Sequence, residues 1–394
     1  MKILLLSFTD SSNFGDQLIV EQLKKRLQNY GDVITYSYSF KKNIEYLTLK
    51  TPPISKEKLN KIKQIYSDYF RKNILFDKLH GFNMVHNQKK RINKSEFLYD
   101  LQKSDLLVIG GGNTIFDLTK HSRSADKYEV IVSQAIKEKK IIYFMDIGIG
   151  PFCTEKQLIK TRQLLSKADF VTVRDEASQS LLEKLPNVQL SIDPVFSYEN
   201  SMVTKISNNK IGFSVIDLRL NKSSKTEYEK YLLATKKLIL KILNFYPDQE
   251  IVLFNSEVRD YVAVNDLITL LKNTNRIESI FIGSKSDLIE LYKNLKLIVG
   301  TRMHSMILAI SQGIPIVGLS WQAKVTEMFK IMSDEKSVFP ITGIEENIDG
   351  IFAQINEKIL SPNCFMSHNF EKVKKLENIN IINLEEIKAS LKNE

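Results

Sequence analysis

The sequence predicts an α/β protein in which parallel sheets carry helices on both faces. Short β-branched and aliphatic runs alternate with segments of helical periodicity, and the alternation restarts in the second half of the chain. The length of 394 residues exceeds one ordinary core and fits two domains. We expect a first domain over residues 1–200, a second over 201–345, and a helical tail over 346–394 that packs across the domain junction.

In the first domain, strands and helices can be assigned in chain order. The expected strands are 2–7, 33–38, 105–109, 141–145, 170–173 and 189–192. The helices expected between them are 16–30, 127–138, 155–166 and 176–185. In the first of these helices Leu18, Leu23 and Leu27 recur at helical spacing, which gives it one apolar face.

The second domain repeats this pattern. Its expected strands are 210–216, 250–254, 279–282, 296–299 and 314–319. Its expected helices are 226–245, 260–272 and 304–312. The polar segment 198–209 lacks periodicity, and we therefore expect it to link the two domains.

Residues 39–100 interrupt the alternation and are too long for an ordinary crossover between strands. They are basic and aromatic, with Tyr66, Tyr69, Phe70 and Arg71 on an expected helix and a Lys-Lys-Arg run at 89–91. We interpret them as an inserted helical cover, with a patch for a bulky acceptor as the alternative.

Charge and cysteine content exclude several classes of protein. The formal net charge of +10 suits anionic partners, although lysines on solvated faces explain it equally well. No nucleic-acid-binding motif accompanies the charge, so we expect no nucleic acid partner. Cys153 and Cys364 give neither a disulfide framework nor a metal site, and no apolar stretch is long enough to span a bilayer. We expect a cytoplasmic protein, with peripheral contact at the inner membrane face compatible with the charge.

The most informative motif is Gly-Thr-Arg-Met-His at 300–304, where an apolar strand turns sharply into a helix. The helix start offers unpaired backbone N–H groups and the positive end of the helix dipole. Arg302 adds a fork that matches carboxylate or phosphate, and His304 adds an imidazole that can exchange protons near neutral pH. The motif predicts a pocket for a small acidic substrate, although a lone histidine is usually structural. Gln312 and Lys324 would lie on the rim of this pocket.

The turn after the first strand is a second candidate, because ligands of open α/β sheets bind at the carboxyl ends of strands. It contains Asn13, Gly15 and Asp16. A strand–helix turn with a capping residue explains these residue types fully. The functional interpretation places the turn at the floor of a cleft, with Asp16 near an acceptor hydroxyl.

Two further strand ends carry candidates. Gly110, Gly111, Gly112 and Asn113 follow the strand at 105–109, where successive amides could form an anion nest. They match neither a dinucleotide fingerprint nor a phosphate-binding P-loop. Arg174 ends the strand at 170–173 and either forms a surface ion pair with the next residue or joins the arginine at 302 around one substrate.

In this order, the motifs resemble the polysaccharide pyruvyl transferase family over roughly residues 1–330. The motifs are Asn-Phe-Gly-Asp at 13–16, Gly-Gly-Gly-Asn at 110–113, Arg-Asp-Glu at 174–176, Asp-Pro at 193–194, Gly-Thr-Arg-Met-His-Ser at 300–305 and Gln-Gly-Ile-Pro at 312–315. The resemblance implies a GT-B-like fold, with two Rossmann-like domains that face each other across a cleft. It implies an N-terminal domain on the acceptor side and a C-terminal domain on the donor side.

The resemblance also implies an activity. Pyruvate would pass from phosphoenolpyruvate to a sugar of an exopolysaccharide, capsule or cell-wall polymer, or of its lipid-linked precursor, with formation of a ketal and release of phosphate. Phosphoenolpyruvate is then the donor substrate, and neither a cofactor nor a metal is expected. The alternatives are a nucleotide-sugar glycosyltransferase of the same architecture and a non-catalytic binding protein. Against the glycosyltransferase, this sequence has no obvious acidic residue on the 304–312 helix, or after Pro315, to bind a ribose.

Carried over residue by residue, the donor-binding basic groups fall on Arg174, Arg302 and His304, next to Ser305. The loop at 321–324 keeps the aromatic residue and the lysine of the family but has alanine where members often have proline. In the mechanism we expect, His304 transfers a proton or stabilises the leaving phosphate, and Asp16 is the base.

Overall fold

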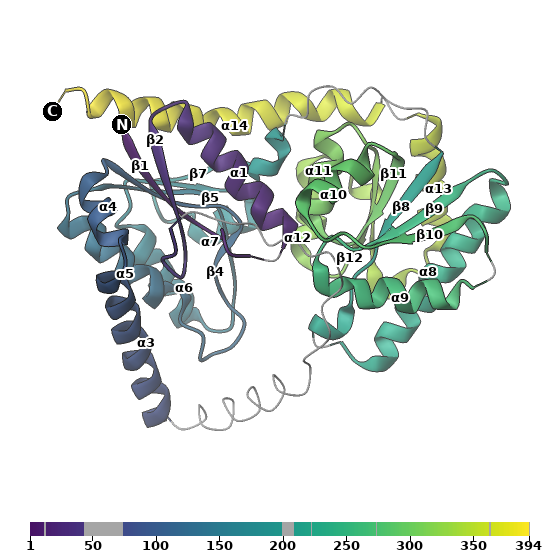
Figure 1. Cartoon of the computed structure of the whole chain (residues 1–394), viewed down its shortest axis with the longest axis horizontal. Coiled ribbons are helices and arrows are strands. Elements are labelled where there is room, and N and C mark those ends of the chain that lie inside the picture. The colour runs from purple at the N-terminus through teal and green to yellow at the C-terminus, as the bar shows by residue number, and fades with distance from the viewer. Residues whose placement is uncertain are drawn as a thin grey trace.

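The computed structural model describes residues 1–11, 13–42, 74–198, 209–221, 223–272, 274–361 and 364–393. Figure 1 shows two α/β units side by side, each built on its own sheet, with the last helix lying along one edge of the pair. All pairings between the strands of the two sheets are parallel among these residues, as the alternation of strands and helices predicts.

The first sheet has the strand order β2-β1-β3-β5-β6-β7, and β4 pairs with β5. Its strands are β1 (Lys2–Ser7), β2 (Asp32–Ser37), β3 (Leu106–Gly110), β4 (Asn113–Asp117), β5 (Ile141–Phe152), β6 (Phe170–Val173) and β7 (Val188–Leu190). In β1, Ile3 and Leu5 join the apolar cluster that contains α1, whereas Leu4 and Leu6 join the cluster that contains α5. Alternate residues of a strand face opposite ways, so the unbroken apolar run of β1 reflects a sheet covered on both faces.

The second sheet has the strand order β10-β9-β8-β11-β12-β13. Its strands are β8 (Lys210–Ser214), β9 (Glu250–Phe254), β10 (Ile277–Ile280), β11 (Leu295–Gly300), β12 (Ile316–Ser320) and β13 (Val338–Pro340). Counted within the unit, this is the Rossmann order third-second-first-fourth-fifth-sixth. The order reverses between β8 and β11, and between β1 and β3 in the first sheet. Ligands of such sheets bind beyond the carboxyl ends of the strands at these reversals.

Helices cover both sheets. They are α1 (Phe14–Gln28), α3 (Ile74–Lys94), α4 (Phe97–Lys103), α5 (Ser124–Lys137), α6 (Glu155–Leu165), α7 (Glu176–Leu182), α8 (Lys225–Phe245), α9 (Tyr261–Leu270), α10 (Lys285–Tyr292), α11 (Met303–Ser311), α12 (Ala323–Ile331), α13 (Ile348–Leu360) and α14 (Cys364–Ser390). Local sequence sets several starts: Thr154 with Gln157 and Ser224 with Glu227 form capping boxes at α6 and α8. In the described part of the chain, no helix combines the length and the apolar composition needed to cross a bilayer.

The sequence predicts β1, β6 and β9 with the bounds that the structure shows. Strand β5 continues past its predicted end at 145 to Phe152. The sequence does not predict β4, β13, α10 or α12. Strand β13 has three residues, and β4 reads Asn-Thr-Ile-Phe-Asp, so neither carries a clear apolar pattern.

The predicted linker at 198–209 and much of the predicted insertion at 39–100 lie outside the described residues, which omit 43–73 and 199–208. Tyr66, Tyr69, Phe70 and Arg71 belong to the omitted part. The described end of the insertion is α3, which contacts α4 and α5. The basic run at 89–91 is exposed on this helix.

The two units contact each other mainly through α1 and α11. Helix α1 contacts α10 and α11, and α11 contacts the short 3-10 helix Pro194–Ser197 of the first unit. Leu18 of α1 and Met303 of α11 belong to one apolar cluster. A backbone bridge joins Asn13 to Glu257. The N-terminal ends of α1 and α11 therefore meet where the carboxyl ends of the two sheets approach each other.

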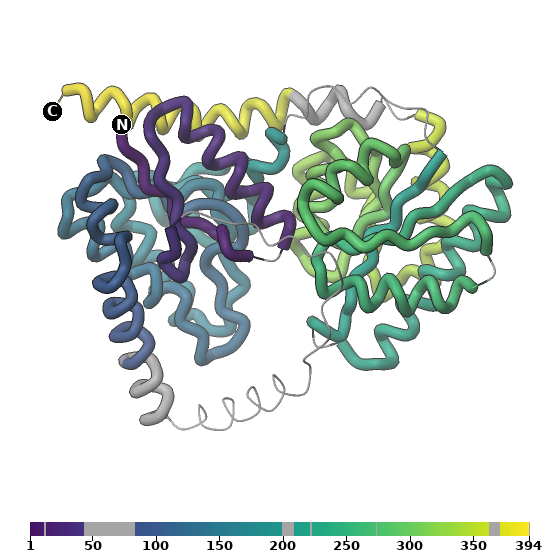
Figure 2. The backbone as a smooth tube through the Cα atoms, in the orientation of Figure 1, coloured from purple at the N-terminus to yellow at the C-terminus, as the bar shows by residue number. Residues whose placement is uncertain are grey.

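The C-terminal tail divides between the two units. Helix α13 packs against α8, β11 and β12, whereas α14 returns to the first unit, as the yellow tube in Figure 2 shows. There Tyr143 donates a hydrogen bond to Oδ1 of Asn380 at 2.6 Å, and Nδ2 of Asn380 donates to Asp146 at 2.7 Å. Arg26 bridges Asp146 and Glu377 at 2.8 and 2.9 Å. A buried polar network thus fastens the last helix to the first sheet.

Candidate functional site

A pocket lies where the two units meet. Its lining residues are Asn13, Gly15, Leu18, Ser256, Leu288, Arg302, Met303, His304, Ser305, Gln322 and Lys324. It spans about 400 Å³ with its open mouth included. The structure thus brings together six residues that the sequence singles out from three segments: Asn13, Gly15, Arg302, His304, Ser305 and Lys324.

Three helices begin at this pocket. Helix α1 starts after Asn13, whose side chain accepts a hydrogen bond from the Gly15 amide at 2.9 Å. Helix α11 starts after Arg302 and α12 after Gln322, and neither of these residues supplies a side-chain cap. Uncapped starts leave backbone N–H groups and the positive dipole ends facing outward, which favours an anion.

His304 lies in the first turn of α11 and is 8% exposed. Its Nε2 atom lies 3.3 Å from Oδ2 of Asp193 and 3.3 Å from Nη1 of Arg174. A Cβ atom on Gly15 would lie 2.3 Å from the Nδ1 atom of His304, so only glycine permits this approach of α1 to α11. The imidazole of His304, which belongs to the second unit, is therefore positioned by contacts with the first unit.

Arg174 follows β6 and is buried. Its Nη1 donates to Asp193 at 2.8 Å, whereas its Nε lies 3.8 Å from Asp175, which caps α7. The expected ion pair with the next residue is thus present, and Asp175 caps the helix, but the arginine is buried and its shorter ion pair is with Asp193. Burial alone would raise the pKa of Asp193, but the adjacent His304 and Arg174 hold it well below its usual range.

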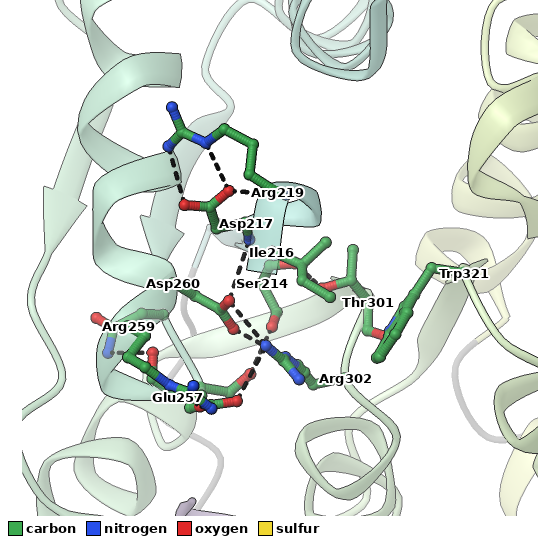
Figure 3. Close-up of polar contacts among 12 residues, drawn as sticks. Ser214, Ile216, Asp217, Arg219, Glu257, Arg259, Asp260, Thr301, Arg302 and Trp321 are labelled. Atoms are coloured by element: carbon green, nitrogen blue, oxygen red, sulfur yellow. Dashed lines mark hydrogen bonds and ion pairs between the residues drawn. The ribbon is translucent and has the colours of Figure 1, made fainter. Parts of the chain in front are cut away.

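Arg302 is bound by two carboxylates of its own unit, as Figure 3 shows. Its Nε and Nη2 atoms donate to Asp260 at 2.8 Å each, and Nη2 lies 3.0 Å from Glu257. Burial would lower the pKa of Arg302, and the two carboxylates raise it instead. The sequence suggests an open cationic fork, but Asp260 occupies the fork. In the described part of the chain, no residue accepts a hydrogen bond from Nη1 of Arg302, so this atom can donate to a ligand.

Lys324 lies in the first turn of α12 and lines the pocket. It forms no hydrogen bond or ion pair with any residue that the structure describes. Burial and the nearby charges of Arg174 and Arg302 lower its pKa to about 8. The carboxylates of Asp16 and Asp193 lie near enough to oppose this shift, so Lys324 brings to the pocket a positive charge that has carboxylates nearby but no ion-pair partner among the described residues.

Trp321 stands beside the pocket at the end of β12. Its indole Nε1 donates to the carbonyl oxygen of Thr301 at 3.0 Å. The guanidinium carbon of Arg302 lies 5.5 Å from the centre of the indole ring, within the range of a cation–π contact. The indole therefore has a fixed position next to the arginine.

Asp16 and the glycine run lie close by but outside the pocket lining. Asp16 accepts a hydrogen bond from Ser11 at 2.7 Å. A Cβ atom on Gly112 would lie 3.8 Å from Oδ1 of Asp16. Gly111 and Gly112 have φ values of +77° and +70°, which turn β3 into β4, and the Gly111 amide already donates to Met145. That amide is therefore not available to an anion nest.

Other predicted residues have structural partners or lie elsewhere. Ser305 lines the pocket, but its hydroxyl is bonded to Tyr292 within the second unit. Asn113 donates to the Gly150 carbonyl at 3.2 Å, and Gly110 ends β3. Gln312 follows the last residue of α11, about 13 Å along the helix axis from its start. The structure therefore does not bring Gln312 to the pocket. The prediction considered the direction of its side chain around the helix but not its distance along the helix axis.

Three carboxylates of the site do not appear among the residues predicted for it. Asp193 lies before the 3-10 helix of the first unit, and Glu257 and Asp260 follow β9. The sequence could have indicated Glu257 and Asp260, because polar residues that follow β9 lie at the same carboxyl edge of the sheet as Arg302. Within the described ranges, no group of three His, Cys, Asp or Glu side chains could hold a metal ion.

Comparison with known proteins identifies the family and the fold of this chain. The model of the polysaccharide pyruvyl transferase family matches residues 13–323. No curated protein matches the sequence. Among solved structures, the UDP-GlcNAc 2-epimerase of Methanocaldococcus jannaschii is 12% identical with a TM-score of 0.54, over 97% of this chain and 100% of that one.

Two more solved structures are similar over the whole chain. The UDP-GlcNAc 2-epimerase of Neisseria meningitidis, bound to UDP-GlcNAc, is 15% identical with a TM-score of 0.53, over 98% of this chain and 100% of that one. The spinosyn rhamnosyltransferase SpnG is 10% identical with a TM-score of 0.52, over the same shares. These identities show the fold alone, and they confirm the GT-B-like arrangement of two Rossmann-like domains.

Proposed function

This chain belongs to the polysaccharide pyruvyl transferase family, and on that premise we propose that it transfers pyruvate from phosphoenolpyruvate to a sugar of a cell-surface polysaccharide or its lipid-linked precursor. The product is a ketal, in which C2 of pyruvate is bonded to two sugar oxygens. The observation that carries the proposal is the pocket itself, where the starts of α11 and α12 meet Lys324, which has no ion-pair partner among the described residues.

The pocket suits a small molecule with a carboxylate and a phosphate. Lys324 and the uncapped amides of α11 and α12 offer positive charge and N–H donors within one small space. Nη1 of Arg302 adds a donor from the second unit, and the Arg174–His304 pair adds donors from both units.

The reaction balances with two sugar hydroxyls. Phosphoenolpyruvate takes a proton at C3, its methylene becomes a methyl group, and C2 becomes electron-poor. One hydroxyl bonds to C2, the C2–O bond to phosphate breaks, and the second hydroxyl bonds to C2 to close the ketal. One hydroxyl proton replaces the proton taken up at C3, and the other leaves with phosphate. We assign proton transfer at C3 or at the leaving phosphate to His304, and proton removal from the acceptor to Asp16.

Phosphate release tests the proposal. The protein is incubated with phosphoenolpyruvate and a panel of lipid-linked saccharides, and parallel samples receive UDP-sugars. We expect phosphate release only with phosphoenolpyruvate and a saccharide, together with an increase in melting temperature on addition of phosphoenolpyruvate alone. Nucleotide release from a UDP-sugar would instead identify a glycosyltransferase. Binding of phosphoenolpyruvate without phosphate release from any saccharide would identify a binding protein.

A lipid-linked acceptor would bring the protein to the cytoplasmic face of a membrane. The formal net charge of +10 favours a surface of anionic lipid. Co-sedimentation with phosphatidylglycerol vesicles should exceed that with phosphatidylcholine vesicles and should weaken as salt is added. Equal sedimentation with both kinds of vesicle would contradict this part of the proposal.

A further inference from the structure

A second cavity lies in the first unit, apart from the donor pocket. It is formed by the end of β4, the segment that leads into α5 and the first two turns of α6. It spans about 460 Å³ with its open mouth included. None of the residues in the proposed reaction lines it. The cavity lies at the carboxyl ends of β4 and β5, which is the edge where ligands of such sheets bind.

The lining of this cavity has an excess of positive charge. It carries four cationic side chains and two carboxylates: Lys120, Arg123, Lys156, Lys160, Asp117 and Asp126. Asp126 accepts a hydrogen bond from Lys160 at 2.5 Å and lies 3.7 Å from Arg123. Asp117 accepts a hydrogen bond from the Ser124 amide at 3.0 Å. Lys120 and Lys156 form no ion pair with any residue that the structure describes, so their charges are available to an anion.

The two available lysines are brought together by one glutamine. Gln157 follows Lys156 in α6, and its Nε2 donates to the carbonyl oxygens of Thr119 and Ser122 at 2.9 and 3.0 Å. These two carbonyls flank Lys120 in the chain. The segment that carries Lys120 is therefore fastened to the helix that carries Lys156. The cavity is thus a built site, in which positive charge from two elements converges.

Strand β4 connects this cavity with the donor pocket. At its start, Asn113 pairs with Gly148 of β5. A Cβ atom on Gly148 would lie 3.0 Å from Nε of Arg174, and Arg174 contacts His304 of the donor pocket. At its end, Asp117 lines the cavity. The strand spans about 13 Å between these two residues, so an extended ligand that follows β4 reaches both sites.

Two exposed apolar side chains border the cavity in the chain. Leu118 follows Asp117 and is 62% exposed, and Ile159 precedes Lys160 and is 44% exposed. A free phosphate ion needs only the positive charges. Apolar side chains next to ammonium groups suit a phosphate that carries a lipid, because its first methylene groups are then removed from water.

We propose that this cavity binds the phosphate groups that link the acceptor glycan to its lipid. An ammonium group is a compact charge with three N–H donors and binds phosphate oxygens well. The inference rests on the proposed function and deepens it. The acceptor runs from its phosphate at Lys120 and Lys156 along β4 to the donor pocket, and it stays on the first unit, as the family resemblance implies.

The double variant Lys120→Gln/Lys156→Gln tests the assignment. Both lysines are exposed, so the variant should fold and keep the melting temperature of the wild type. The matched control is Lys137→Gln/Lys184→Gln, which removes the same charge from exposed positions of the first unit outside the cavity.

Binding at the cavity can be followed without an activity assay. Cys153 is exposed and directly precedes Thr154, which lines the cavity. In a Cys364→Ser background it is the only thiol of the chain, and a trifluoromethyl label on it gives one ¹⁹F NMR signal. Inorganic pyrophosphate is the titrant, and phosphatidylglycerol vesicles are added in a parallel series.

We expect pyrophosphate to shift the ¹⁹F signal of the wild type and of the control with the same Kd, and to bind the double variant about tenfold more weakly. In the phosphate-release assay the double variant should raise KM for a lipid-linked saccharide about tenfold and leave KM for phosphoenolpyruvate unchanged. The control should leave both KM values unchanged.

Three results would overturn the assignment. They are a wild-type signal that pyrophosphate does not shift, equal pyrophosphate binding by the wild type and the double variant, and an unchanged KM for the lipid-linked saccharide. A signal that shifts with the vesicles, together with that unchanged KM, would assign the cavity to a membrane lipid instead. If the wild type releases no phosphate with any saccharide, the proposed function fails, whereas the pyrophosphate titration still decides whether this cavity binds phosphate.

Discussion

Replacing Gly15 by alanine should damage the site more than the fold. The new Cβ atom would lie 2.3 Å from Nδ1 and 2.4 Å from Cβ of His304. Because one of these atoms is the first of the side chain, rotation of the imidazole cannot relieve the contact. Helices α1 and α11 must separate by more than about 1 Å to reach ordinary van der Waals distance.

The expected magnitudes follow from this displacement. Overpacking of this kind costs about 1–3 kcal/mol of unfolding free energy, and replacement of glycine by alanine in a helix recovers about 1 kcal/mol. The net loss of stability is therefore small. A shift of about 1 Å in catalytic geometry costs about 100-fold in rate, so kcat/KM for phosphoenolpyruvate should fall by that factor.

Gly350→Ala is the matched control, because Gly350 also lies in the first turn of a helix and its nearest contact would be an ordinary 3.4 Å. Urea denaturation and phosphate-release kinetics are measured for both variants. We expect Gly350→Ala to be as active as the wild type and slightly more stable. If Gly15→Ala keeps kcat/KM within about twofold of the wild type, the inference that contact with α1 positions His304 is refuted.

Three further predictions concern charge and the last helix. Lys324→Met should raise KM for phosphoenolpyruvate about tenfold. The affinity of the wild type for phosphoenolpyruvate should fall as pH rises through about 8, because the lysine loses its charge there. Lys324→Arg should move that loss of affinity to higher pH, and a pH profile that does not shift would show that Lys324 does not bind the donor. Asp193→Asn leaves Arg174 without its buried counter-charge and should cost about 3–5 kcal/mol of unfolding free energy. The native pKa of Asp193 is depressed, so the unfolded chain binds the extra proton and wild-type stability falls as pH drops through the ordinary carboxyl range, a slope that calorimetry should find flatter in the variant. Asn380→Ala removes hydrogen-bond partners from several buried polar groups and should lower the unfolding free energy, measured by urea denaturation, by about 1–3 kcal/mol. Ile382→Ala, at a position 53% exposed on the same helix, should change it by no more than about 0.5 kcal/mol. Equal losses in the two variants would mean that the polar network contributes nothing specific to stability.

Much of the fold was predictable because its signal is local. A parallel strand buried on both faces is a short apolar run, and β1, β6 and β9 have this form. Strands β4 and β13 are held by pairing with neighbours distant in sequence, and their own residues carry little pattern. Sequence periodicity alone does not reveal such strands.

The candidate site was predictable in its location but not in its pairings. Residues at the carboxyl ends of strands line the binding site in this class of fold, so Arg174 and His304 could be expected on the two sheet edges that face each other. Which carboxylate neutralises which cation depends on how segments distant in sequence pack together. For that reason Arg302, which follows β11, was expected to be open but is bound by Asp260 and Glu257, which follow β9 of the same unit.

The return of α14 to the first unit affects how the chain can be made. The polar network around Tyr143 and Asp146 is completed by Asn380, which is synthesised more than two hundred residues later. Vectorial folding, in which a leading domain matures before the next emerges, is therefore incomplete here: Arg26 and Ser191 can already bind Asp146, but the leading unit exposes this face until α14 has been synthesised, and incompletely packed intermediates are a hazard for aggregation.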